Sequence, residues 1–193
     1  GYTTGTLSWT PNFFQAGSHS ITFTATNAIS GSGNTVVTVA NVDRAPVVNA
    51  PPTASGAEGQ HLTFHVTAVD PDGEAITTLT PSGLPLSAMF VPDPGNTGGT
   101  FSWDPDYDQA GSYGVSFTAS NALSNTDATH ITVTNTDRAP VVTAPATATG
   151  AENGVLMVTV TAADPDGQGI LSLTASGVPT GAVVTPSADK TTG

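Results

Sequence analysis

Apolar and polar residues alternate with a period of two along most of the chain, a pattern typical of strands that bury one face. In the stretch HLTFHVTAV, residues 61–69, every second side chain is apolar and points the same way: Leu62, Phe64, Val66 and Ala68. The residues between them are His and Thr, which predicts that the other face of this strand meets water. Residues 112–120 and 129–134 alternate in the same manner and are predicted strands as well.

Shorter segments complete the predicted sheet structure, at residues 45–48, 75–80, 87–91 and 100–104. Gly, Pro, Asp and Asn, the usual turn residues, separate them. About seven short strands predict an all-β fold, an antiparallel β-sandwich of the immunoglobulin-like or cadherin-like class. Trp103 is the largest predicted core residue, and Tyr113 begins a late strand, where such sandwiches carry a tyrosine corner.

Similar sequence occurs twice in the chain at a fixed spacing. The stretch GTLSWTPNFFQAGSHSITFTATNA begins at Gly5, and GTFSWDPDYDQAGSYGVSFTASNA begins at Gly99, so the offset is 99 − 5 = 94 residues. Residues 5–48 and 99–142 are identical at 25 of 44 aligned positions, without any gap. This identity is far beyond chance and predicts tandem sandwiches, each with about seven strands in a repeat of 94 residues.

Two similar Pro-containing stretches mark the joints between the repeats: NVDRAPVV at 41–48 and NTDRAPVV at 135–142. They predict the C-terminal half of one repeat at 1–43, a complete repeat at 44–137 and the N-terminal half of a further repeat at 138–193. Head-to-tail copies, or more chain on either side, would complete the two halves. We therefore expect neighbouring repeats or second copies of the chain as partners.

The charge of the chain narrows the range of partners. Fifteen Asp and Glu stand against 3 Lys and Arg, which gives a formal net charge of −12. So few cations argue against binding to nucleic acid or to an anionic membrane surface. The chain has no cysteine and no apolar run of membrane-spanning length, so we expect neither disulfides nor membrane insertion in this segment. Many Thr and Ser with few Lys suggest a secreted microbial protein at the cell surface.

The stretch DPDG occurs at residues 70–73 and again at 164–167. It has the residues that a β-turn favours, with Asp first, Pro second and Gly fourth. Its two carboxylates also suit calcium, which takes six to eight oxygen ligands, so one such loop needs help from the preceding repeat. Two interpretations therefore stay open, a turn alone and half of a metal site.

Other chemistry finds less support in the sequence. His61 and His65 lie two residues apart on one strand face, but no third ligand for a transition metal accompanies them, which favours surface residues. No nucleophile elbow, phosphate loop or dinucleotide fingerprint occurs. Carboxylate pairs that hydrolyse glycosidic bonds need a cleft, which a narrow sandwich lacks. We expect no catalytic residues and no enzyme activity.

Several motifs together carry a family resemblance: GTFSWDPDYDQAGSYGVSFTASN, SGLP at 82–85, AEGQHLTFHVTAVDPDG and the joint NTDRAPVV. They resemble bacterial extracellular tandem repeats of the dystroglycan-type cadherin-like and immunoglobulin-like kind, and the resemblance covers the whole chain. Repeats of this kind serve as spacers and stalks in surface proteins, adhesins and fibres, and they also occur beside enzyme domains. The resemblance thus implies a structural segment of an extracellular fibre, stalk, adhesin or surface layer.

Cadherins proper bind calcium at the joints between repeats, and the resemblance implies calcium as the cofactor here. Carried over by motif, the ligands of the second joint would be Glu58, Asp108, Asp137, Asp164 and Asp166. The match is incomplete, because YDQ replaces an Asp-Arg-Glu motif and Asp137-Arg138 replaces Asp-Asn. Carboxylates about 5 Å apart repel by about 3 kcal/mol at an effective dielectric of 20, so such a cluster needs a cation or abundant water.

The first joint retains fewer of the implied ligands. Asp43, Asp70 and Asp72 are present, but Phe14 occupies the position that corresponds to Asp108. The glutamate that corresponds to Glu58 would lie before residue 1. The resemblance therefore implies a poorer calcium site at the first joint than at the second.

An adhesive or carbohydrate-binding accessory module is the alternative function, with a cell-surface or matrix ligand. Sugar binding of this kind calls for exposed aromatic side chains in a row. Trp9 and Trp103 occupy equivalent core positions, so Phe13 and Tyr107 are the only predicted exposed pair. The structural role is therefore the better supported of the two.

Overall fold

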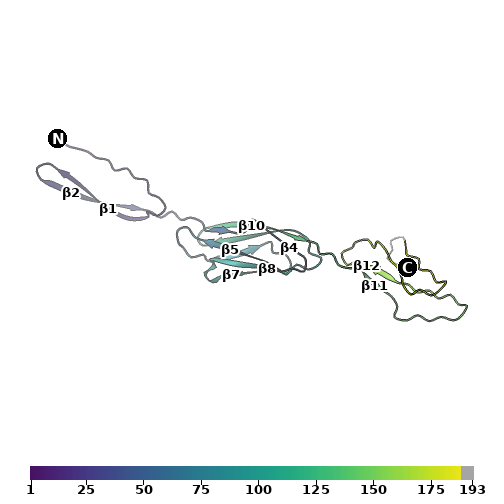
Figure 1. Cartoon of the computed structure of the whole chain (residues 1–193). Helices are drawn as coiled ribbons and strands as arrows, with labels where there is room; N and C mark the ends of the chain where they lie inside the picture. Colours follow the sequence, from purple (N-terminus) through teal and green to yellow (C-terminus); the bar gives the residue numbers. More distant parts are fainter. Residues whose placement is uncertain (188–193) are drawn as a thin grey trace. The chain divides into compact units, whose positions relative to one another are not determined.

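The computed structural model describes residues 1–187, and Figure 1 shows the chain. The described part contains no α-helix, and its single helical turn is the 3-10 segment η1, Pro94–Asn96. The strands follow in chain order: β1 Gly17–Thr26, β2 Ser30–Val39, β3 Val47–Asn49, β4 Thr53–Ala57, β5 Leu62–Val69, β6 Thr78–Ser82, β7 Met89–Pro92, β8 Gly98–Trp103, β9 Gly111–Ser120, β10 Ser124–Thr134, β11 Val141–Thr143 and β12 Thr161–Ala163. The predicted all-β fold is confirmed.

The strands β3 to β10 form two four-stranded sheets, in the orders β3-β5-β8-β7 and β4-β10-β9-β6. Aromatic side chains join the two layers, since Phe64 of β5 stacks on Phe101 of β8 at 4.6 Å and meets the edge of Phe117 of β9 at 6.0 Å. The largest apolar side chains in this core are almost fully buried: Trp103, Phe101, Phe117, Leu79, Ile131, Val66 and Val115. This is the immunoglobulin-like β-sandwich that the sequence predicts.

Along β5, buried and exposed residues alternate with the predicted period of two. Leu62, Val66 and Ala68 are buried, and Thr63 and His65 between them are exposed. In the antiparallel register, Leu62 lies opposite Trp103 of β8. The alternation therefore sets which side chains reach the core.

The strand β4 is absent from the sequence prediction. Its residues TASGA are all small, so they show no alternation of large apolar side chains. Two predicted strands also differ in extent, since β6 begins at Thr78 and β10 begins at Ser124. Hydrogen bonding with neighbouring strands, rather than local hydrophobicity, places these elements.

An edge-to-face aromatic pair recurs in both copies of the repeated sequence. Trp103 meets Tyr113 with ring centroids 4.9 Å apart and an interplanar angle of 80°. In the N-terminal copy, Trp9 meets His19 at 4.8 Å and 82°. The histidine thus preserves the ring contact although it replaces the tyrosine.

The described residues group into two compact units. One comprises Gly1–Ala54, Leu62–Trp103 and Ser112–Ile131, and the other comprises Ser55–His61, Asp104–Gly111 and the chain from Thr132 on. The first contains the β1–β2 hairpin and most of the sandwich core, and the second contains β11 and β12. The division at 1–43, 44–137 and 138–193 stays a prediction, and residues 188–193 lie outside the described residues.

The second unit repeats a detail of the sandwich. Val141, Val142 and Thr143 of β11 pair with Ala163, Ala162 and Thr161 of β12. The pairs between β3 and β5 are Val47 with Val69, Val48 with Ala68 and Asn49 with Thr67. Every partner differs by the repeat offset of 94, so the two sheets share one register.

Candidate functional site

Both DPDG stretches form the predicted turn. The Gly73 N–H donates to the Asp70 carbonyl at 3.1 Å, and Gly73 has a φ of +81°, which glycine adopts without strain. The Asp70 carboxylate closes the turn from within, because its Oδ1 accepts from the N–H groups of Asp72 at 2.8 Å and Glu74 at 3.2 Å. Residues 164–168 make the same bonds at 2.9 and 3.2 Å.

The second aspartate of each turn binds the arginine of the joint. Arg44 donates from Nε at 3.0 Å and from Nη2 at 2.7 Å to Asp72 Oδ1, and its backbone N–H donates to Oδ2 at 2.8 Å. At the second joint, Arg138 donates from Nε to Asp166 Oδ1 at 2.8 Å and from its backbone N–H to Oδ2 at 2.6 Å. Each guanidinium also donates from Nη2 to the carbonyl of the turn proline, Pro71 or Pro165.

These carboxylates are shielded from water while the arginines are partly exposed. The side chains of Asp72 and Asp166 are 8% and 4% exposed, and those of Arg44 and Arg138 are 25% and 29% exposed. Hydrogen bonds from the Arg44 side chain lower the pKa of Asp72 below its usual value, against the opposing effect of burial. At the second joint, the backbone hydrogen bond from Arg138 is the main cause of the lowered pKa of Asp166.

Aromatic rings cover the other side of each guanidinium. Arg44 Cζ lies 4.9 Å from the ring centroid of Phe13 and 5.0 Å from that of Phe14. Arg138 Cζ lies 5.0 Å from the ring centroid of Tyr107. We call each set of arginine, turn aspartate and aromatic residues an arginine clasp. Each clasp connects residues before the joint to the turn after it.

Asp108 adds a surface contact to the second clasp. Its Oδ1 lies 3.2 Å from Arg138 Nη2, and its side chain is 86% exposed. An ion pair this exposed contributes little on its own. Its counterpart in the first clasp is Phe14. The first clasp therefore has a ring contact at the position where the second clasp has an ion pair.

Glu58 lies inside the protein rather than at the surface. It is 1% exposed, and its Oε1 accepts from the Ala110 N–H at 2.6 Å while its Oε2 accepts from the Thr136 N–H at 2.9 Å. The Thr136 hydroxyl also donates to the Glu58 carbonyl at 2.9 Å. Both carboxylate oxygens thus tie Thr136, in the second joint, to the loop that precedes β9.

The predicted metal ligands of the second joint therefore fall into different environments. Asp166 binds Arg138, Glu58 binds backbone N–H groups, Asp164 holds its own turn, and Asp137 is exposed. Over residues 1–187, no group of three or more His, Cys, Asp or Glu side chains is arranged to hold a metal ion. Calcium at this joint stays a prediction.

At the first joint, Asp72 binds Arg44, and other acidic residues act on Glu74 electrostatically. Asp43 is the main cause of the raised pKa of Glu74, followed by burial and by Asp70 and Asp72. Asp43 Oδ1 is buried and has no hydrogen-bond partner among the described residues. Asp70 is more fully bonded, because its Oδ2 accepts from Asn121 Nδ2 at 2.8 Å.

The two strand histidines are surface residues, as predicted. His61 Nδ1 lies 2.8 Å from Asp104 Oδ1, and His65 Nε2 lies 2.8 Å from Asp93 Oδ2. The histidine side chains are 55% and 47% exposed. They therefore belong to exposed pairs, one just before β5 and one on it.

One finding bears on the relation of the chain to membranes. Within residues 1–187, no helix has the length and apolar character needed to cross a bilayer.

A family model matches the central part of the chain. Residues 43–134 match the family model described as "Bacterial Ig domain". No curated protein sequence matches the chain. Among solved structures, the endo-fucoidan hydrolase MfFcnA4 of glycoside hydrolase family 107 matches at 22% identity and a TM-score of 0.40, over 65% of this chain and 20% of that chain.

Two further solved structures match at similar levels. The sialic acid binding region of a Streptococcus sanguinis SK1 adhesin is 16% identical with a TM-score of 0.41, over 65% of this chain and 46% of that chain. The extracellular cadherin domains 1–5 of protocadherin gamma B2 are 16% identical with a TM-score of 0.42, over 76% of this chain and 32% of that chain. The chain spans about a fifth of the length of the fucoidan hydrolase. With the family match and the two-sheet core, the chain contains an immunoglobulin-like domain at residues 43–134.

Proposed function

We propose that this chain is a structural, non-enzymatic spacer segment of an extracellular fibre, stalk, adhesin or surface-layer protein. Its immunoglobulin-like repeats would be joined by arginine clasps that limit movement at the joints. The match to the bacterial Ig domain model supports an extracellular role. The resemblance of the joints and turns to bacterial surface repeats supports the same assignment.

The recurrence of the clasp carries this proposal. Arg44 with Asp72 and Arg138 with Asp166 share two hydrogen bonds, from the backbone N–H to Oδ2 and from Nε to Oδ1, and both positions differ by the repeat offset of 94. A guanidinium presents its donors in a rigid planar fork and stacks on aromatic faces, so it can bind a carboxylate and a ring at once. A joint held in this way transmits force between sandwiches better than a free linker.

Small-angle X-ray scattering of the whole chain tests the role of the clasp. We expect Arg138→Gln to raise the scattering at high angle in a dimensionless Kratky plot, because the joint is released. Arg138→Lys should change the profile in the same direction, since an ammonium lacks the planar fork of the guanidinium. Asp106→Asn is the control, because Asp106 is exposed and, among the described residues, its side chain makes no hydrogen bond or ion pair with the clasp. Identical profiles for all four proteins would contradict the proposal.

The clasp should weaken in acid. Asp72 and Asp166 have folded-state pKa values below the ordinary value of 3.8, so their contribution is present above 3.8 and is lost as the pH falls through the folded-state pKa. The raised pKa of Glu74 has the opposite sign, because protonation of Glu74 relieves repulsion. We therefore expect the scattering difference between wild type and Arg138→Gln to be full at pH 7 and to vanish well below pH 3.8. A difference that persists in acid would show that the carboxylate plays no part.

Calcium binding at the first joint is a second candidate, favoured by the buried Asp43 oxygen, which has no hydrogen-bond partner among residues 1–187, and by the electrostatic effect of Asp43 on Glu74. A ligand that binds only the folded state stabilises it by about 2.7 kcal/mol at a concentration of 100 times Kd. If calcium binds there, melting in calcium and in chelator should differ for the wild type and not for Asp43→Asn. Equal melting temperatures for the wild type in both conditions would show that calcium does not bind there. The turn and the clasp would then hold the joint without a metal.

The adhesive or carbohydrate-binding alternative stays a prediction. Its expected aromatic pair, Phe13 and Tyr107, lies against the joint arginines. Both rings are still partly exposed, at 53% and 44%. Tryptophan fluorescence titrated with polysaccharides would report sugar binding close to Trp9 or Trp103.

A further inference from the structure

The two aspartates of each DPDG turn differ in reactivity because of the residue that follows each one. Asp70 precedes Pro71, whose nitrogen carries no hydrogen, whereas Asp72 precedes Gly73, whose N–H is not hindered by a side chain. Such an N–H group can attack the Cγ atom of the preceding aspartate and close a cyclic imide. Asp-Gly is the aspartyl bond most prone to this reaction, and the sequence contains it only in the two DPDG turns.

The reaction converts aspartate to isoaspartate without a change in mass. The glycine nitrogen forms a bond to Cγ, and the hydroxyl of the carboxylic acid leaves with the amide proton as water. Water then opens the imide at either carbonyl. Opening at the former backbone carbonyl leaves a main chain that runs through Cβ and Cγ, so the turn is lengthened and the former side-chain carboxylate is no longer available to the clasp.

The turn needs both residues of this reactive pair. Gly73 and Gly167 have φ values of +81° and +75°, a left-handed backbone that glycine adopts without strain. Asp72 is placed so that its carboxylate accepts from both the backbone N–H and the side chain of Arg44. A less reactive residue at either position would therefore strain the turn or weaken the clasp.

The first clasp restrains both groups that would have to react. Arg44 donates to both oxygens of Asp72, from its backbone N–H to Oδ2 at 2.8 Å and from Nε and Nη2 to Oδ1 at 3.0 and 2.7 Å. The attacking nitrogen is engaged as well, because the Gly73 N–H donates to the Asp70 carbonyl at 3.1 Å. Ring closure must first break these hydrogen bonds, and those to the carboxylate are charge-assisted and strong.

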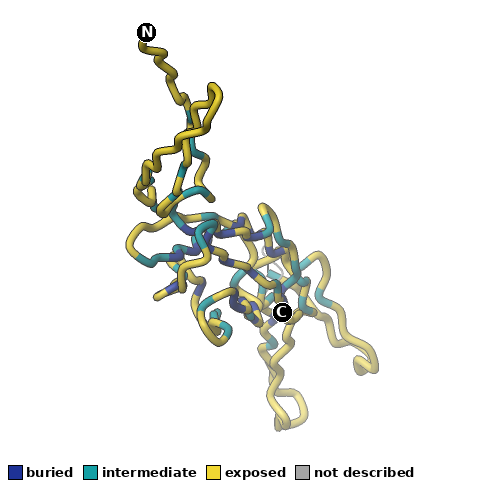
Figure 2. Tube along the Cα trace, turned by 90° about the vertical axis from the view of Figure 1, so that its left-hand side faces the viewer, coloured by how far each residue is buried: buried dark blue, intermediate teal, exposed yellow. Residues whose placement is uncertain are grey.

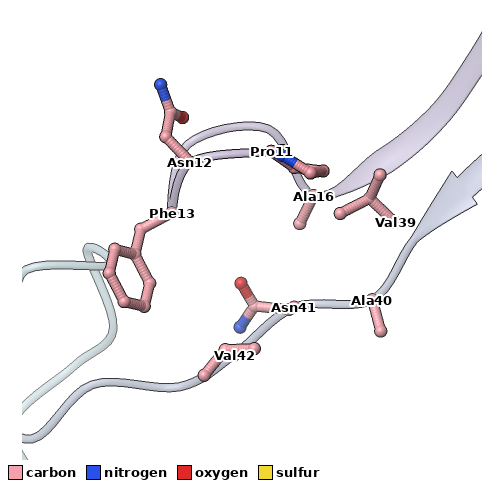
Figure 3. A pocket seen from close by; sticks show the side chains of 8 residues that line it. All are labelled: Pro11, Asn12, Phe13, Ala16, Val39, Ala40, Asn41 and Val42. Carbon is pink, nitrogen blue, oxygen red and sulfur yellow. The ribbon is translucent and has the colours of Figure 1, made fainter. Parts of the chain in front are cut away.

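Burial limits the access of water to the same carboxylate. Buried residues are concentrated in the strands of the sandwich (Figure 2), yet the side chain of Asp72, in a turn, is only 8% exposed. The ring of Phe13, whose centroid lies 4.9 Å from Arg44 Cζ, covers the guanidinium. Figure 3 shows this ring at one end of a hollow that Asn41 and Val42 also line. A covered guanidinium loses fewer of its hydrogen bonds to competing water.

The second joint restrains its Asp-Gly pair in the same way. Arg138 donates to both oxygens of Asp166, at 2.6 and 2.8 Å, and this side chain is 4% exposed. The Gly167 N–H donates to the Asp164 carbonyl at 3.1 Å. In both turns, the arginine thus binds the aspartate before glycine and leaves the one before proline to other donors.

We propose that Asp72 and Asp166 are latent sites of isoaspartate formation and that the arginine clasps hold them in the aspartate form. The reaction consumes only water, so it needs no enzyme and proceeds wherever a clasp is released. The inference goes beyond the spacer role, because it gives the clasps a chemical effect as well as a mechanical one. It depends on the geometry of the clasps and holds whether or not the chain is a spacer.

Ageing of the folded chain tests the proposal. The wild type, Arg44→Gln and Arg138→Gln are kept at neutral pH for weeks, and isoaspartate at each turn is measured by peptide mapping with electron-transfer fragmentation. We expect Arg44→Gln to raise isoaspartate at Asp72 by about tenfold or more, since even one charge-assisted hydrogen bond is worth a factor of that order. Asp166 should be unchanged in that variant, and Arg138→Gln should give the reverse pattern. No rise at either turn, or an equal rise at both in each variant, would overturn the proposal.

Asn121→Ala is the matched control for the first turn. Asn121 Nδ2 donates to Asp70 Oδ2 at 2.8 Å, so it supports the same turn but, among the described residues, makes no hydrogen bond to Asp72. We expect isoaspartate at Asp72 to accumulate in this variant at the wild-type rate. A rise equal to that of Arg44→Gln would show that the turn as a whole, and not the clasp, protects the bond.

A measurement on the wild type keeps the test independent of how well the variants fold. The wild type in urea has neither clasp and gives the unprotected rate at both turns. The folded wild type should form isoaspartate more slowly by about tenfold or more, and equal rates would overturn the proposal. Asn153-Gly154, the only Asn-Gly pair in the sequence, deamidates through the same kind of imide and serves as an internal reference for the incubation. Circular dichroism checks that each variant remains folded.

Discussion

We expect Trp103→Ala to lower the free energy of unfolding of the intact repeat by about 3–5 kcal/mol. Trp103 is 1% exposed, so its removal leaves a cavity among side chains that cannot fully collapse. Its indole N–H donates to the Leu86 carbonyl at 3.1 Å, and its ring meets Tyr113, so both contacts are lost as well. With no disulfide to constrain the unfolded chain, this loss is a large part of the stability of one domain. Urea unfolding followed by circular dichroism would measure it.

The repeated sequence supplies a matched control in the same chain. Trp9→Ala removes the same ring at the equivalent position, where Trp9 is only half-buried and contacts His19. We expect a cost of less than half that of Trp103→Ala, because fewer surrounding atoms lose their contacts. Equal costs at the two positions would mean that the core of the intact repeat does not depend on Trp103 as the structure indicates.

The alternation of residues was sufficient to predict the sandwich because burial of one strand face is a local property of sequence. The contrast between Val66 and His65 on β5 could be read directly from that pattern. The strand β4 could not, because its small residues gain their place from hydrogen bonds with other strands. The alternation therefore predicts the class of fold, and the hydrogen bonds between strands determine the remaining strands.

The joints show where sequence reasoning was incomplete. The DPDG turn was predictable from its own residues, but the partner of its second aspartate lies 28 residues away in the chain. A signal was present, because two of the chain's 3 Lys and Arg occupy equivalent positions in the DRAPVV joints. The resemblance to cadherins pointed to carboxylates and calcium. It did not indicate that an arginine of the chain itself could be the cation beside these carboxylates. In both clasps, a guanidinium provides positive charge beside the turn carboxylate.

Glu58 illustrates a related difficulty, since a carboxylate carried over as a metal ligand is buried against backbone N–H groups. Its position depends on the loop at Ala110 and on Thr136, which are distant in sequence. A buried acid of this kind is tolerated only when both oxygens are bonded. The glutamate therefore has a structural role in the described chain that the spacing of acidic residues alone does not reveal, and its role as a calcium ligand stays a prediction.

We expect Glu58→Ala to lower the free energy of unfolding by about 2–5 kcal/mol, because the Ala110 and Thr136 N–H groups lose their acceptors inside the protein. Glu58→Gln should cost less, since its amide oxygen can still accept one of the two bonds while its NH₂ faces the other donor. Glu152→Ala is the matched control: the equivalent glutamate is exposed, and in dilute protein its loss should change the free energy by less than about 0.5 kcal/mol. Urea unfolding should therefore give the lowest free energy of unfolding for Glu58→Ala, a higher one for Glu58→Gln and one close to the wild type for Glu152→Ala. A Glu58→Ala protein as stable as the Glu152→Ala protein would show that the carboxylate does not hold the loop and the joint strand together.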